Sequence, residues 1–76
     1  MFGPTSYTFT INMSKEQLLA VYSGSIQRVR VVTDEGLVLD LDAQHLKDFT
    51  TMEGIHGVFK LTVNRNNKFV NLRQIG

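Results

Sequence analysis

The chain has 76 residues, with 8 Lys and Arg against 7 Asp and Glu and a formal net charge of +1, which limits it to one small domain. It contains no Cys, so disulfides and thiolate metal sites are excluded, and its two His residues lack the neighbouring ligands of a structural zinc site. Hydrophobic residues make up 42% and charged residues 20% of the chain, a balance that excludes an intrinsically disordered protein.

Residues 1–6 are interpreted as an N-terminal arm that precedes a single domain of residues 7–76. The arm has no basic residue and no long apolar run, so a secretory signal is not expected. No apolar run of the chain is long enough to cross a membrane, and a cytoplasmic protein without membrane partners is predicted. A core of this size lies near the limit of independent stability, and we therefore expect self-association.

Alternating apolar and polar residues predict a first strand over residues 7–13. A helix is predicted next, over about residues 15–23, because Ser14 and Gln17 have the spacing of a capping box. Gly24 supplies a left-handed residue that can end this helix.

Residues 28–33 and 37–42 also alternate, and the loop of residues 34–36 predicts a hairpin between them. One register satisfies both faces of this hairpin, since apolar side chains meet on one face and opposite charges meet on the other. The expected ion pairs are Arg28 with Asp42 and Arg30 with Asp40. This pairing explains the two carboxylates without a catalytic or metal site, and it removes both arginines from any free basic patch.

In residues 43–49 the apolar residues no longer alternate with polar ones, and Leu46 and Phe49 lie three residues apart, which predicts a short 3₁₀ or α-helical turn. Residues 50–57 are interpreted as a loop that contains two glycines. Strands are predicted over residues 59–63 and 68–75, joined by a turn at residues 64–67.

Two registers of this second hairpin remain open. A turn centred on residues 65–66 places Leu61 opposite Val70, whereas one centred on residues 66–67 places Leu61 opposite Leu72. Both registers bury the same side chains, and both place Phe69 on the outward face.

The predicted fold class is α+β and mostly β, in the order β-α-β-β-β-β. Five short strands with evenly spaced turns predict a strongly bent antiparallel sheet or a small, partly open barrel. The helix after the first strand would cover one open end.

Short motifs occur along nearly the whole chain: Tyr7-x-Phe9, Tyr22-x-Gly24, Gly36, Leu46-x-x-Phe49, Gly54-Ile55-x-Gly57-x-Phe59-x-Leu61 and Asn67-Lys68-Phe69. In these motifs the chain resembles a family of short bacterial proteins, found mainly in γ-proteobacteria, that is catalogued as a domain of unknown function. The resemblance implies a stand-alone bacterial cytoplasmic protein. It implies no activity, ligand or functional residue.

No group of residues predicts catalysis. Asp42 and Asp48 lie three residues before and after His45, a spacing that can meet on a helical turn, but a solvated polar turn is the simpler interpretation. His56 is interpreted as a surface residue of a loop. We therefore expect no enzyme, no cofactor and no metal site.

The charges are divided unevenly between the two parts of the chain. Residues 1–53 contain four basic and seven acidic residues, a net charge of −3, whereas residues 54–76 contain four basic residues and no acid. A basic face with an exposed aromatic ring is typical of a surface that binds single-stranded nucleic acid. The candidate contact residues on or near the second hairpin are Lys60, Arg65, Lys68, Phe69, Asn71 and Arg73.

A protein contact explains the same features in another way. A partner subunit can cover Phe69, and the negative part of one copy can meet the positive part of another. We favour a non-enzymatic binding or structural module that acts through protein–protein contacts. Weak binding of single-stranded RNA or DNA through the second hairpin is the alternative.

Overall fold

The computed structural model describes residues 5–76 and shows a mostly β protein whose order of strands and helices agrees with the prediction. Residues 1–4 of the predicted arm lie outside the described residues, whereas Thr5 and Ser6 belong to the first strand. None of the helices in residues 5–76 is long and apolar enough to cross a membrane. The elements are β1 (Thr5–Ser14), α1 (Lys15–Tyr22), β2 (Arg28–Val32), β3 (Val38–Asp42), the 3₁₀ helix η1 (Ala43–Phe49), β4 (Gly54–Val63) and β5 (Phe69–Gln74).

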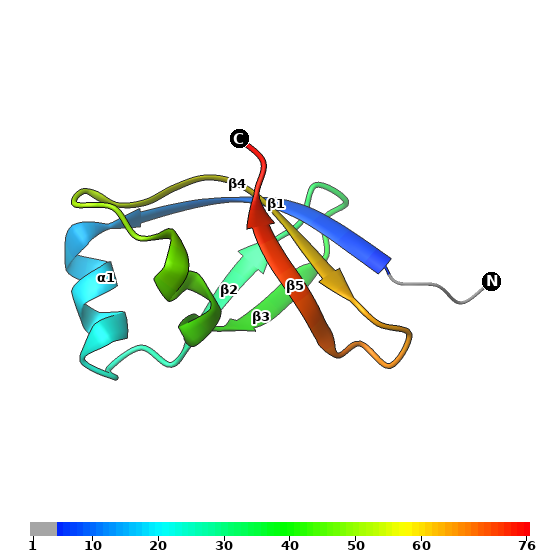
Figure 1. Ribbon diagram of the computed structural model, residues 1–76, viewed down its shortest axis with the longest axis horizontal. Helices are drawn as coiled ribbons and strands as arrows, with labels where there is room; N and C mark the ends of the chain where they lie inside the picture. The colour runs from blue at the N-terminus through cyan, green and yellow to red at the C-terminus, as the bar shows by residue number, and fades with distance from the viewer. Residues whose placement is uncertain (1–4) are drawn as a thin grey trace.

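The strands form two antiparallel sheets, one in the order β1-β4-β5 and the other of β2 and β3 (Figure 1). The predicted single bent sheet is therefore divided, and the described strands do not form a closed barrel. One isolated bridge, between Phe9 and Thr33, connects the two sheets, and beside it the Asp34 N–H donates to the Thr8 carbonyl at 2.9 Å.

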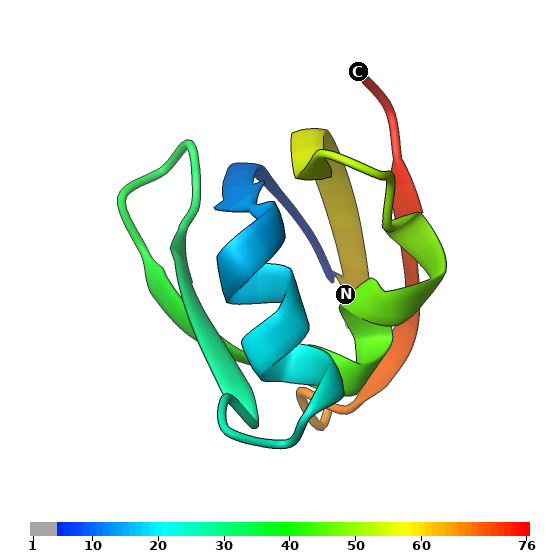
Figure 2. The same cartoon turned by 90° about the vertical axis from the view of Figure 1, so that its left-hand side faces the viewer.

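The helix α1 begins at the predicted capping box. The Gln17 N–H donates to Ser14 Oγ at 3.2 Å, and the Ser14 N–H donates to Gln17 Oε1 at 2.9 Å. These two bonds satisfy backbone donors that the first helical turn leaves without partners. Leu18 and Val21 face the core. Figure 1 shows α1 at one end of the molecule, next to the end of β1, and Figure 2 looks onto this end.

The predicted register of the β2–β3 hairpin is confirmed, with Arg28 opposite Asp42 and Arg30 opposite Asp40. Only the second of these forms an ion pair in residues 5–76, with Arg30 Nε 3.2 Å from Asp40 Oδ1. Asp42 Oδ1 instead accepts from the Gln44 N–H at 3.0 Å and caps η1. The predicted Arg28–Asp42 ion pair is therefore wrong, and the Asp42 carboxylate caps η1 instead.

The strand β4 begins at Gly54, so the predicted loop over residues 50–57 is too long by four residues. β4 pairs with β1 along its whole length, from Thr5 opposite Val63 to Ser14 opposite Gly54. Gly54 has φ +115°, and a Cβ atom there would collide with the Met13 carbonyl oxygen. Glycine therefore lets the two backbones approach at the end of β4.

A β-bulge changes the face on which Phe69 lies. Leu61 pairs with Leu72, as in one of the two predicted registers, but Val63 pairs with Phe69, and the register shifts between Thr62 and Val63. Phe69 thus shares the inner side of the sheet with Val63. The prediction that Phe69 faces outward is wrong, because the extra residue of a bulge breaks the strict alternation on which it relied.

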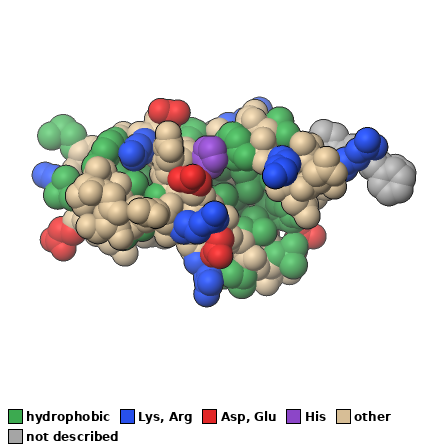
Figure 3. Space-filling model, turned by 90° about the horizontal axis from the view of Figure 1, so that it is seen from below, with side chains coloured by type: hydrophobic (Ala, Val, Ile, Leu, Met, Phe, Trp, Pro, Cys, Tyr) green, Lys and Arg blue, Asp and Glu red, His purple; other side chains and the backbone are tan. Residues whose placement is uncertain are grey.

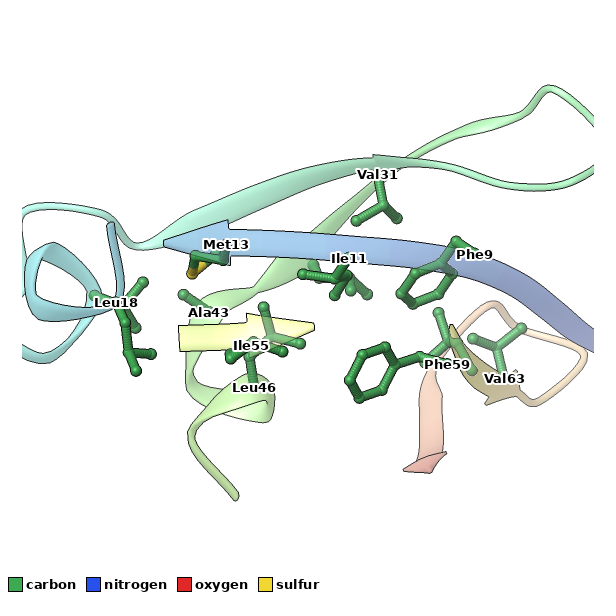
Figure 4. Packing of buried hydrophobic residues seen from close by; sticks show 13 residues of the cluster. Phe9, Ile11, Met13, Leu18, Val31, Ala43, Leu46, Ile55, Phe59 and Val63 are labelled. Atoms are coloured by element: carbon green, nitrogen blue, oxygen red, sulfur yellow. The ribbon is translucent and has the colours of Figure 1, made fainter. Parts of the chain in front are cut away.

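The core lies between the two sheets and the helices, and Figure 4 shows how its side chains converge. Phe59 is fully buried, with its ring 5.2 Å from that of Phe49 in an edge-to-face arrangement and 6.4 Å from that of Phe9. Aromatic rings supply much of the buried area in so small a core. The other residues with no measurable exposure are Phe9, Leu46 and Ile55.

Candidate functional site

An open groove of about 360 Å³ lies between β3 and the β4–β5 hairpin. We call it the edge groove, because β3 and β5 are the outermost strands of their sheets. Seen from below, the molecule shows hydrophobic side chains bordered by charged ones (Figure 3). The groove is lined by Tyr7, Leu39, Asp40, Leu41, Asp42, His45, Leu61, Val63, Asn67 and Phe69.

Phe69 forms one wall of the edge groove and stacks on His45 of η1. The two ring centroids are 3.8 Å apart and the ring planes differ by 1°. A second open cavity, of about 520 Å³ between η1 and β5, is lined by the same two rings. One face of Phe69 is therefore covered from within the chain, and the residue remains 42% exposed.

Two strand edges border the edge groove, although β1 and β2 are also outermost strands of their sheets within residues 5–76. Within residues 5–76, β3 pairs only with β2, and β5 pairs only with β4. Every second residue of such a strand directs its N–H and C=O groups away from the sheet. An edge of this kind can accept another strand unless its side chains prevent the approach.

Three of the predicted contact residues, Lys60, Asn71 and Arg73, lie on the outer face of the β1-β4-β5 sheet. Lys60 is directly opposite Arg73, and Thr62 is opposite Asn71. None of the three strands contains Asp or Glu. We call this surface the outer basic face; its two cations have no acidic neighbour within their own sheet.

The other two basic residues of the predicted set lie at the turn between β4 and β5, where Arg65 and Lys68 are exposed. The Asn64 side chain holds this turn, because its Oδ1 accepts from the N–H groups of Asn66 at 2.8 Å and Lys68 at 3.0 Å. The structure therefore divides the predicted set among three places. Lys60, Asn71 and Arg73 share the outer basic face, Phe69 lines the edge groove, and Arg65 and Lys68 mark the turn.

The histidines contact neutral groups. His56 Nδ1 lies 3.2 Å from Asn12 Oδ1, and its Nε2 lies 3.3 Å from the Glu53 carbonyl oxygen. His45 stacks on Phe69, a contact that sequence reasoning missed because it joins η1 to β5. In the part of the chain that the structure describes, no three His, Cys, Asp or Glu residues gather as a metal-ligand group.

Comparison with known proteins yields one match. The model of a family described as "Protein of unknown function (DUF2835)" matches residues 5–75, which confirms the resemblance to a family of unknown function seen in the motifs. No curated protein and no solved structure matches the chain.

Proposed function

The chain belongs to the DUF2835 family of proteins of unknown function, and we propose that it is a non-enzymatic binding module that acts through protein contacts and self-associates. The edge groove carries this proposal. It combines a lining of apolar and polar side chains, a half-exposed aromatic ring and the edges of β3 and β5, which have no further strand beside them within residues 5–76. Exposed apolar surface next to an unpaired edge is typical of an interaction site.

Exposed apolar side chains on the two edge strands support a protein contact. Val38 at the start of β3 is 58% exposed, and Val70 in β5 and Ile75 just after it are exposed to a similar extent. A chain of 76 residues buries little apolar surface by itself. Burying these side chains against another copy would therefore stabilise a domain whose own core is small.

The division of charge supports a contact between unlike parts of two copies. Residues 1–53 carry −3 and residues 54–76 carry +4, so an arrangement that joins the first part of one copy to the second part of another is attractive. Such complementarity guides association and fixes orientation more than it sets affinity.

We expect the protein to sediment at micromolar concentration as a species heavier than its 8.6 kDa monomer. Salt should shift the distribution towards the monomer, since at about 1 M NaCl the screening length falls to about 3 Å. Sedimentation velocity at low and high salt measures both effects. A monomer at every concentration and salt condition would contradict self-association.

The outer basic face favours a second candidate function, weak binding of single-stranded RNA or DNA. Lys60 and Arg73 are cross-strand neighbours without an acid in their sheet, and phosphate groups would relieve the repulsion between them. Phe69 does not lie on this face, so no predicted ring accompanies these cations. This candidate therefore relies on phosphate contacts alone.

We expect a labelled single-stranded oligonucleotide to lose affinity for the double variant Lys60→Ala, Arg73→Ala at low salt. The slope of log affinity against log salt for the unmodified protein should be about −1.4 if two phosphates are neutralised. Fluorescence anisotropy provides the measurement. The control is Lys15→Ala, Arg28→Ala, which removes the same charge from exposed positions outside this sheet; an equal loss in both variants would contradict binding at the outer basic face.

A further inference from the structure

We infer that the open edge of β3 binds an extended segment of another protein in which basic and apolar residues alternate. The inference rests on the proposed role of the edge groove in protein contacts and names the segment that fits it. Such binding adds a strand to a sheet: main-chain hydrogen bonds provide the affinity, and alternate side chains provide the specificity. Both contributions follow from the way β3 pairs with β2.

The hydrogen bonds at the two ends of the β2–β3 hairpin show which main-chain groups of β3 are free. The Thr33 N–H donates to the Leu37 carbonyl at 2.8 Å, and the Ala43 N–H donates to the Gln27 carbonyl at 3.0 Å. Successive residues of an antiparallel strand direct their main-chain groups to opposite sides. The odd-numbered residues from 37 to 43 therefore bond to β2, and the even-numbered residues between them direct their N–H and C=O groups to the open edge. These even-numbered residues are Val38, Asp40 and Asp42.

The side chains of β3 alternate in the same way. Asp40 and Asp42 are exposed on the solvent side, whereas Leu39 and Leu41 pack in or against the core. Both leucines line the edge groove, together with the half-exposed ring of Phe69. A strand added along β3 would thus place every second side chain beside a carboxylate and the others in the groove. Cations suit the first positions and apolar side chains suit the second.

Both carboxylates can accept from a further cation. Asp40 Oδ1 lies 3.2 Å from Arg30 Nε, and the Asp40 side chain is 48% exposed. Asp42 Oδ1 accepts from the Gln44 N–H, and this carboxylate forms no ion pair within residues 5–76. Each carboxylate has a second oxygen with free acceptor capacity. A cation at the open edge would therefore not have to displace an existing partner.

The strand β2 already shows that β3 accepts this pattern. Residues 28–31 read Arg-Val-Arg-Val, and they place arginines opposite Asp42 and Asp40 and valines opposite Leu41 and Leu39. β3 presents the same two faces at both of its edges, so a second segment with this alternation fits the open edge as well. Agreement of the charged and the apolar face specifies one register.

The open edge of β3 has none of the features that protect a strand edge. β3 contains no Lys, Arg, Pro or Gly, and its pairing with β2 has no bulge. The edge of β5, across the groove, carries Arg73 and a register shift in its pairing with β4. Basic side chains and bulges are common ways to prevent the approach of another strand. Strand addition is therefore expected at β3 and not at β5.

The sequence of the chain directs this edge towards a different protein. The register that pairs all five residues of β3 with β3 of a second copy places Asp40 opposite Asp40, and like charges directly opposite are destabilising. Within residues 5–76 only β2 has two basic residues alternating with apolar ones, and β2 is already paired with the other edge of β3.

The probe is a labelled, terminally blocked peptide with the sequence of residues 27–33, and fluorescence anisotropy measures its binding. A peptide of the same composition with its two arginines adjacent should bind about tenfold more weakly. N-methylation of the second arginine removes an N–H that would donate to β3 and should also cost about tenfold. N-methylation of the valine that follows is the matched control, because that N–H points away from β3 and its loss should have no effect.

Asp40→Lys in the protein should weaken binding of the unmethylated peptide about tenfold, because an attractive cross-strand pair becomes a repulsive one. Glu53→Lys makes the same charge change at an exposed position outside β3 and should bind like the unmodified protein. Circular dichroism melting shows whether both variants are folded. In the unmodified protein, the peptide should slow amide hydrogen exchange at Val38 and Asp40 and leave the amides of Leu39 and Leu41, which already bond to β2, unchanged.

Equal binding of the alternating and the rearranged peptide, or unchanged exchange at Val38 and Asp40, would overturn strand addition at β3. A loss of binding on methylation of the valine and not of the arginine would also overturn it, because the peptide would then have displaced β2. If the protein still self-associates in sedimentation, the proposed function survives either result. A protein that stays monomeric but binds the peptide along β3 would contradict self-association and leave this inference standing.

Discussion

Replacing Phe59 with Ala is expected to lower the free energy of unfolding by about 3–5 kcal/mol. The side chain is fully buried and its ring packs against those of Phe9 and Phe49. Truncation removes this apolar contact and leaves a cavity that residues on regular strands cannot fill. Urea unfolding followed by circular dichroism at one fixed protein concentration measures the change, since association alters apparent stability.

Phe69→Ala is the matched control for this substitution. Phe69 is 42% exposed and contacts His45 over one face, so we expect a loss of about 1 kcal/mol, the scale of a stacked aromatic pair. Similar losses in the two variants would contradict the assignment of Phe59 to the centre of the core and of Phe69 to the groove wall.

Replacing Gly54 with Ala is expected to cost about 3 kcal/mol, because two separate terms add. The backbone has φ +115°, a conformation that residues with a Cβ atom rarely adopt. A Cβ atom there would also collide with the Met13 carbonyl oxygen, and backbone cannot move aside as the end of a flexible side chain can. The expected result is a lower urea midpoint with an unchanged dependence on urea concentration.

Gly24→Ala separates the cost of the left-handed backbone conformation from the cost of the collision. Gly24 has φ +86°, but a Cβ atom there would meet nothing within 4 Å. We therefore expect a loss of about 1 kcal/mol from the left-handed conformation alone. Equal losses at Gly24 and Gly54 would mean that the backbones of β1 and β4 do not approach as closely as the structure shows.

Local chemistry made part of this fold predictable. The capping box at Ser14 and the hairpin loop at residues 34–36 each depend on neighbours within a few positions, and both are confirmed. The β2–β3 register followed because one alignment satisfied the apolar and the charged face together. The Thr33 N–H donates to the Leu37 carbonyl at 2.8 Å, as that alignment requires.

The second half was harder to predict because its backbone is irregular. Gly54 and Gly57 suggested a turn, but they occupy strand positions where β4 runs beside β1. The bulge in the β4–β5 hairpin has no turn residue to mark it. Its effect is to move Phe69 to the inner side of the sheet, which no alternation rule can anticipate.

Of the six predicted contact residues, only Phe69 lines the edge groove. The prediction that Lys60, Asn71 and Arg73 share one face of the second hairpin is confirmed. The edge groove depends on how two sheets are placed relative to each other, and the stack of His45 on Phe69 joins η1 to β5. Such long-range placement leaves no periodic signal in a single sequence.

The isolated bridge between Phe9 and Thr33 also has a consequence for local unfolding. β2 and β3 contribute two buried apolar side chains, Val31 and Leu41, to the core, and one isolated bridge with the neighbouring Asp34–Thr8 hydrogen bond connects their sheet to the other. Segments with few buried contacts open at lower free energy than the whole domain. We therefore expect the amide groups of the β2–β3 hairpin to exchange with solvent by an opening that requires less free energy than unfolding of the whole domain.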